Sequence, residues 1–159
     1  MMEVRAIDPW AREPLEKFLK ESGARLCLLT NPSGQVIAQY GFSRAVDVMA
    51  AAALGAGIIS SSKEMAGMLA EEEAFDALNH QGKKHGIFLA EFASPQGRLV
   101  VLIVYGRESS PGLVQLFFEE FVADIGESCP PREPRPPVIA SDFEKDLNEN
   151  LRTLFGGGV

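Results

Sequence analysis

The sequence contains few basic residues, only two cysteines and no apolar run long enough to span a bilayer. Its 159 residues include 15 Lys and Arg against 22 Asp and Glu, which gives a net charge of −7. This balance argues against a nucleic-acid-binding protein, because no Lys- and Arg-rich patch is available to neutralise phosphates. Cys27 lies in an apolar run and Cys129 in a proline-rich segment, so we expect two free thiols rather than a disulfide.

Signals for secretion or membrane insertion are also missing. The first ten residues, MMEVRAIDPW, show no apolar core of a secretory signal. The longest apolar stretch, Val48 to Ile59, is too short to cross a bilayer and continues into the polar SSSKE. We therefore expect a cytoplasmic protein that does not insert into membranes.

Motifs for catalysis and ligand binding are missing as well. The run from Gly55 to Ser60 lacks the Gly-Lys pair of a phosphate-binding loop and lies inside a predicted helix. His80 and His85 flank two lysines with no cysteine nearby, which makes a poor metal site. We therefore predict a protein that is not an enzyme and has no cofactor, no metal and no small-molecule substrate.

What the sequence does contain is an ordered series of apolar patterns separated by turn-forming residues. The patterns predict a helix, two strands, a long helix, three strands and a helix, in that order. This order indicates an α+β domain with a five-stranded antiparallel sheet. The predicted helices cover roughly 14–22, 46–72 and 113–125, and the predicted strands 25–30, 35–40, 75–81, 85–93 and 98–105.

The C-terminal part has a different composition. Five prolines in residues 129–137 favour an extended tether, and SDFE at 141–144 matches a helix capping box. The sequence therefore predicts a domain at 1–127, a Pro-rich linker at 128–140 and a C-terminal amphipathic helix and tail at 141–159. One apolar face of that helix comprises Phe143, Leu147, Leu151, Leu154 and Phe155.

The long predicted helix is unusual because residues 50–70 read AAAALGAGIISSSKEMAGMLA. Each glycine costs about 1 kcal/mol relative to alanine in a helix, so small side chains indicate that another backbone comes close. A simpler interpretation is that the alanines only favour the helix.

We divide the helix into three faces at 100° per residue. The predicted core face is Leu54, Ile58, Met65, Met68 and Leu69, the predicted dimer interface is Ala51, Gly55, Ile59, Ser62 and Ala66, and the predicted partner-binding face is Ala53, Ala56, Ser60, Lys63, Glu64 and Gly67.

Several stretches, taken in order, resemble Roadblock/dynein light-chain domains, and among them the bacterial MglB-type proteins. The resemblance covers roughly residues 15–125, and the order and spacing of its pieces are more specific than any one piece. The tail ending LRTLF also looks like an MglB tail. The matching stretches are ARLCLLTNPSGQVIAQYG (24–41), the long helix, EEEAFDALNHQGKKHGIFL (71–89) and RLVVLIVYGRESSPGLVQL (98–116).

The resemblance implies a Roadblock-like fold, with the long helix on one face of the sheet and two helices on the other. It implies a homodimer in which the long helices pack together and the two sheets join edge to edge. It also implies a partner, a small Ras-like GTPase of the MglA type that acts in cell polarity, whose hydrolysis or exchange the dimer regulates. By position, the family's contact with the GTPase falls on Ala56, Ser60 and Glu64, and the apolar face of the tail helix would reach a second site on the GTPase. The sequence departs from the family at Ser60–Ser62, where alanine is commoner, and at Gly106-Arg107, where an acidic residue is usual.

Alternatives remain open at this point. The chain could be a scaffold that binds a partner without affecting nucleotide hydrolysis. Arg107 could act as an arginine finger supplied in trans, although the family acts without one. The C-terminal helix could fold back on the chain's own sheet instead of docking on a partner.

Overall fold

The computed structural model describes residues 3–69, 77–132 and 140–156. The predicted order of elements is confirmed, and one short strand and one short 3-10 helix at the N-terminus are added to it. The elements are β1 (Arg5–Ala6), the 3-10 helix η1 (Pro9–Ala11), α1 (Arg12–Ser22), β2 (Leu26–Thr30), β3 (Val36–Tyr40), α2 (Ala45–Gly67), β4 (Leu78–Gln81), β5 (Gly86–Ser94), β6 (Gly97–Tyr105), α3 (Pro111–Ser128) and α4 (Ala140–Phe155).

The strands form one antiparallel sheet in the order β1-β3-β2-β6-β5-β4. The predicted five-stranded sheet therefore has a sixth strand, because Arg5 and Ala6 pair with Gln39 and Ala38 at one edge. A two-residue strand leaves no alternating pattern in the sequence. The hairpin between β5 and β6 turns at Gly97, whose φ of 104° lies in the region that favours glycine.

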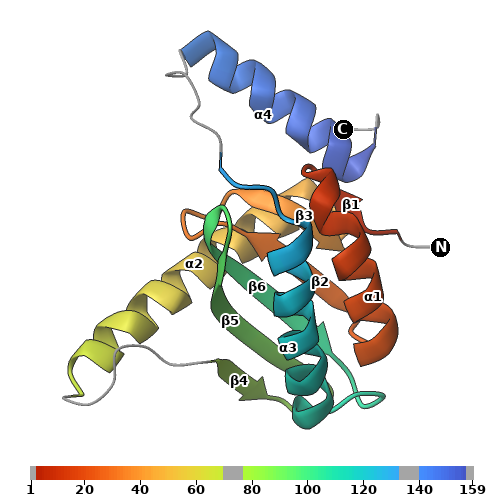
Figure 1. Ribbon diagram of the computed structural model, residues 1–159, viewed down its shortest axis with the longest axis vertical. Helices are drawn as coiled ribbons and strands as arrows, with labels where there is room; N and C mark the ends of the chain where they lie inside the picture. Colours follow the sequence, from red (N-terminus) through yellow and green to blue (C-terminus); the bar gives the residue numbers. More distant parts are fainter. Residues whose placement is uncertain (1–2, 70–76, 133–139, 157–159) are drawn as a thin grey trace.

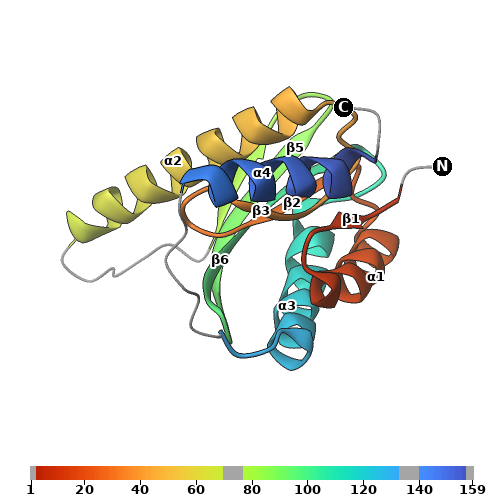
Figure 2. The same cartoon turned by 90° about the horizontal axis from the view of Figure 1, so that it is seen from above.

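Helices α1 and α3 cover one face of the sheet, and α2 covers the other (Figure 2). The face under α1 and α3 holds the main core, in which aromatic rings from both helices and from β5 meet. The rings of Phe18 and Phe121 lie 5.5 Å apart, and Phe118 lies 5.0 Å from Phe88. Such pairs add about 0.5–1.5 kcal/mol each beyond the burial of their apolar area.

Helix α3 begins at Pro111, where the side chain of Ser110 accepts a hydrogen bond from the amide of Leu113. Its buried residues are Val114, Phe118, Phe121 and Ile125. The sequence pattern predicts an apolar face of Leu113, Leu116, Phe117, Phe121 and Ile125 for this helix. This prediction is only partly correct, since Leu113 and Leu116 are exposed. Apolar residues surround the first turns of α3, so periodicity alone could not separate its buried side from its exposed side.

Helix α2 crosses the opposite face of the sheet (Figure 1). It ends at Gly67, five residues before the predicted end at Glu72, and residues 70–76 lie outside the described part of the chain. Helix α3 ends at Ser128 and α4 begins at Ala140. The division into a domain at 1–127, a linker at 128–140 and a tail at 141–159 stays a prediction, and residues 133–139 of the linker lie outside the described residues.

Candidate functional site

The side of α2 that faces the sheet consists of small residues. Val48, Ala52, Gly55 and Ala66 are buried. A Cβ atom placed on Gly55 would lie 3.7 Å from the side chains of both Leu89 and Leu102. The small residues thus let the helix backbone lie close to the sheet. The backbone that we expected to approach these residues is therefore that of the chain's own strands.

The core face predicted for α2 is wrong. The fraction of each residue that is exposed is 68% for Leu54, 39% for Ile58, 61% for Met65, 82% for Met68 and 51% for Leu69. The prediction assumed that the largest apolar residues of a helix face the core. The sheet-facing side of α2 instead carries mostly small residues, and most of the large ones lie at the surface.

The strip predicted as the dimer interface faces the sheet. Gly55 and Ala66 are buried within the chain, and Ala51, Ile59 and Ser62 are half-buried. A second copy of the chain could not reach Gly55 or Ala66 without displacing α2 from the sheet. This strip is therefore the core face of α2, which the sequence analysis had assigned to Leu54 and Ile58.

The face predicted to bind a partner lies at the surface. Ala53, Ser60, Glu64 and Gly67 are exposed, and Ala56 is half-buried. Their side chains are short apart from that of Glu64, so docking there would immobilise few rotatable bonds. We call Ala53, Ala56, Ser60 and Gly67 the small-residue flank of α2.

The opposite side of the same exposed surface carries large apolar residues. Leu54, Ile58 and Met65 follow one another at i, i+4 and i+11, which places them within about 40° of one another around a helix of 3.6 residues per turn. We call these three residues the Leu54 flank. The outermost side of α2, opposite to the sheet, separates the two flanks. Each flank could therefore contact a different protein surface.

Lys63, which was also predicted to bind a partner, holds α2 to the sheet. Its Nζ lies 2.7 Å from Oε1 of Glu91 in β5, and Nε of Arg98 in β6 donates to the same oxygen at 2.6 Å. The Glu91 side chain is 5% exposed, and its Oε2 makes no hydrogen bond with the described residues. Burial raises the pKa of Glu91, but the hydrogen bonds from Lys63 and Arg98 outweigh it, so the net shift is downward.

A second polar cluster lies at one end of the sheet, where β2 and β5 begin and the loop after β6 passes. Nε and Nη2 of Arg25 donate to the two carboxylate oxygens of Glu108 at 2.6 and 3.0 Å, and Nη1 lies 3.1 Å from Nε2 of His85. The hydrogen bonds from Arg25 lower the pKa of Glu108 to about 2. Arg107, the arginine considered as a finger, is exposed beside this cluster. Within the described residues, no group of three or more His, Cys, Asp or Glu side chains could hold a metal ion.

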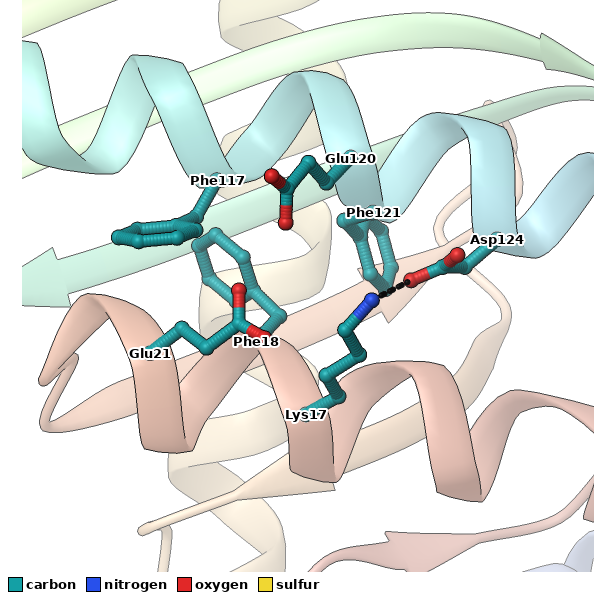
Figure 3. A pocket seen from close by; sticks show the side chains of 7 residues that line it. All are labelled: Lys17, Phe18, Glu21, Phe117, Glu120, Phe121 and Asp124. Carbon is teal, nitrogen blue, oxygen red and sulfur yellow. Dashed lines mark hydrogen bonds and ion pairs between the residues drawn. The ribbon is translucent and has the colours of Figure 1, made fainter.

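A depression between α1 and α3 is lined by side chains of both helices (Figure 3). It has essentially no enclosed volume, whereas pockets that bind small molecules span roughly 300–1,000 Å³. Lys17 from α1 reaches across it to Asp124 of α3, with 3.2 Å between Nζ and Oδ2. The depression is therefore a seam between two helices.

The C-terminal helix contacts the rest of the chain at its last turn. Leu154 is 3% exposed, while Leu147 is 41% exposed, and Leu151 and Phe155 are half-buried. The side chain of Phe143, which was also predicted to bind a partner, lies outside the described part. Of the two interpretations left open by the sequence, fold-back is the one seen in this structure for Leu154 and Phe155.

By length and composition alone, α2 could also cross a membrane, and this helix alone has that property within the described residues. Its most apolar 18-residue window has a mean hydropathy of 1.5, and 17% of that window is buried. The expectation that the apolar run is too short therefore does not hold for the whole helix. However, the sheet-facing side of α2 is packed on protein, so only its outer surface needs a further apolar partner.

Comparisons with known proteins point to one family. The model of the Roadblock/LC7 domain matches residues 11–102, more than half of the chain. A comparison with curated protein sequences gave no match. Among solved structures, the fold is similar to MglB from Myxococcus xanthus, with 23% identity over 70% of this chain and 87% of that one and a TM-score of 0.61. It is also similar to the gliding protein MglB from Thermus thermophilus, with 26% identity over 74% and 87% and a TM-score of 0.63. A third similar structure is an MglB with a tetrameric arrangement, with 25% identity over 74% and 85% and a TM-score of 0.63.

Proposed function

The chain belongs to the Roadblock/LC7 domain family, and from that membership we propose that two copies of it form a regulator of a small Ras-like GTPase of the MglA type. The family is one of regulatory and scaffolding domains, and the similar solved structures include three MglB proteins. The observation that carries the proposal is the outer surface of α2, which one chain leaves uncovered. We expect the regulator to act in the cytoplasm, in the control of cell polarity.

The Leu54 flank is the proposed dimer interface. Leu54, Ile58 and Met65 are exposed in one chain, and packing the same flank of a second copy against them would bury all six side chains around a two-fold axis. This assignment replaces the strip of Ala51, Gly55, Ile59, Ser62 and Ala66, because that strip faces the sheet. Strand β4 lies at the edge of the sheet, so its outer backbone groups could pair with the same strand of the second copy.

The small-residue flank is the proposed contact with the GTPase. Ala53, Ala56 and Ser60 have short side chains, so the switch region of a GTPase could lie close to the α2 backbone there. The chain would act by binding more tightly to the switch arrangement that hydrolyses GTP than to the others. Such a population shift needs no catalytic residue from the regulator.

The test is GTP turnover and nucleotide exchange by an MglA-type GTPase, measured with and without the purified chain. We expect the chain to change one of the two rates at least tenfold at saturation. Demonstrated binding with both rates unchanged would remove the regulator and leave the scaffold as the function.

A matched pair of variants tests the surface. Ala53→Arg introduces a long side chain on the small-residue flank, and Ala123→Arg introduces the same side chain at an exposed position of α3. We expect Ala53→Arg to weaken GTPase binding more than tenfold and Ala123→Arg to leave it unchanged. Equal binding by both variants would move the GTPase contact away from α2.

A further inference from the structure

The C-terminal helix is held by its last turn. Residues 144–149 of α4 are exposed and Asn150 is half-buried, whereas Leu154 is 3% exposed. Figure 1 shows the C-terminal end of α4 next to β1, with the N-terminal end pointing away from the domain. Contacts between α4 and both β1 and α2 agree with this arrangement.

The surface under this last turn is apolar and built from three elements. Phe155 packs against a small cluster of Leu28 from β2 and Val48 and Ala52 from α2, all of which are buried. Phe42, from the loop between β3 and α2, lines the same cluster. The helix end thus completes a core that would otherwise be open at one side.

A buried amide is aimed at the end of the helix. Gln39 of β3 is 1% exposed. Its Nε2 donates to the carbonyl of Phe42 at 3.3 Å and to the carbonyl of Leu154 at 3.2 Å, and its Oε1 accepts from the amide of Phe42 at 3.1 Å. Only the hydrogen bond to Leu154 needs α4 in place, and without α4 one N–H of this buried amide would lose its partner.

A cation lies at the same end. The last carbonyls of a helix carry partial negative charge and favour a nearby positive side chain. Gly156 ends α4 with a φ of 77°, and a Cβ placed on it would lie 3.2 Å from Nη1 of Arg5. Apolar packing, a buried donor and a cation thus converge on the C-terminal end of one helix.

We propose that Gln39, Arg5 and the cluster around Val48 form a binding seat for the chain's own tail helix, and that seating withholds Leu154 and Phe155 from a partner. The second half of this proposal rests on the proposed function, because the partner is the GTPase surface that the tail would reach. Seating and recruitment exclude each other, since both need the same two side chains. The apparent affinity of the tail for the GTPase is then reduced by the fraction of chains whose tail is released.

The first experiment uses the full chain and needs no GTPase. Leu154→Asp places a charge in the seat, and Leu147→Asp places the same charge on an exposed position of the same helix. Amide hydrogen exchange should show protection of α4 falling at least tenfold in Leu154→Asp but not in Leu147→Asp. Equal exchange in the two variants overturns the seat. Protection that falls when the unmodified chain is diluted also overturns it, because the seat would then hold the tail of a second copy.

The second experiment changes the seat and leaves the tail sequence intact. Arg5→Glu places a negative charge beside the helix end, and Arg12→Glu makes the same charge change in α1. We expect Arg5→Glu to speed exchange of α4 severalfold and to bind the MglA-type GTPase severalfold more tightly than Arg12→Glu. Faster exchange with equal GTPase affinity overturns the withholding role. If no variant and no unmodified chain binds the GTPase, the proposed function and the withholding role both fail, while the exchange data still decide whether the seat exists.

Discussion

Two helical layers cover the two faces of one sheet, and they bury their apolar side chains to very different extents. Under α1 and α3, Phe18, Phe88 and Phe121 are at most 2% exposed and pack within one aromatic core. On the other face, the buried residues of α2 are Val48, two alanines and a glycine, and the large residues of the Leu54 flank point away from the sheet.

The difference separates a core from an interface. The layer of α1 and α3 is complete within one chain, because its large side chains meet the sheet. The α2 layer has mostly small side chains facing the sheet and large apolar side chains on its outer surface. One chain leaves that outer surface uncovered. We infer that stability comes mainly from the first face and that assembly comes mainly from the second.

The largest expected effect tests this division directly. Phe121→Ala should lower the free energy of unfolding by about 3–5 kcal/mol, because it removes a buried ring and leaves a cavity. Leu54→Ala should change it by less than about 0.5 kcal/mol when urea denaturation is measured at a protein concentration low enough to keep the chain monomeric. Comparable losses in the two variants would mean that the Leu54 flank is packed within the chain.

A sizeable effect on assembly should come from a charge on the Leu54 flank. Leu54→Glu should weaken self-association about 100-fold, since an unpaired carboxylate would be buried in the dimer. Leu116→Glu places the same charge on α3, where the native leucine is 54% exposed, and should leave self-association unchanged. Sedimentation equilibrium measures both. The reverse result would move the interface to α3.

The same two faces explain how far the sequence could be interpreted. Strands with alternating or continuous apolar residues and the helix that ends before Gly23 were predictable, because local chemistry determines them. The family-level resemblance gave the arrangement of helices around the sheet. The secondary structure and the arrangement of the helices can therefore be predicted without knowing which side chains are in contact.

The faces of α2 could not be predicted in the same way. Leu54 and Ile58 have the hydrophobicity of core residues, and a hydrophobic pattern does not distinguish the chain's own core from an interface with a second copy. The deciding fact is the distance between the α2 backbone and Leu89 or Leu102, which only small residues such as Gly55 permit. Strand β1 and the seat at Gln39 depend in the same way on contacts between segments far apart in the sequence.

Replacing a glycine of α2 by alanine should change the free energy of unfolding by up to about 1 kcal/mol, and it compares the inner and outer sides of the helix. Gly57 is exposed, with no atom within 4 Å of a Cβ placed on it, so Gly57→Ala should raise the free energy of unfolding by about 0.5–1 kcal/mol through helix propensity. Because the outer side is the proposed contact surface, the same change should weaken GTPase binding severalfold.

Gly55→Ala is the matched control for this variant. Its Cβ would be in ordinary van der Waals contact with Leu89 and Leu102, so we expect a similar gain in thermal or urea stability with no change in GTPase binding. If Gly57→Ala binds as tightly as Gly55→Ala, close approach at the outer side of α2 is not required.

The smallest effect concerns the polar cluster at the end of the sheet, which contributes to neither face by packing. The pKa of Glu108 is about 2, below its ordinary value of about 4.3. Its ion pair with Arg25 therefore contributes stability above about pH 4.3, and this contribution is lost as the pH falls through about 2.

Both side chains are about half exposed, 51% for Arg25 and 44% for Glu108, so solvent screens the pair and thermal unfolding at pH 7 should hardly change on Arg25→Gln. The carboxyl resonance of Glu108 in an NMR titration should nevertheless move toward an ordinary pKa without reaching it, because backbone amides at Gly106 and Glu108 also hold the carboxylate. Lys17→Gln, which breaks the pair with Asp124, should leave that titration unchanged. A large loss of thermal stability in Arg25→Gln would show that polar contacts, and not the aromatic core under α1 and α3, carry much of the fold's stability.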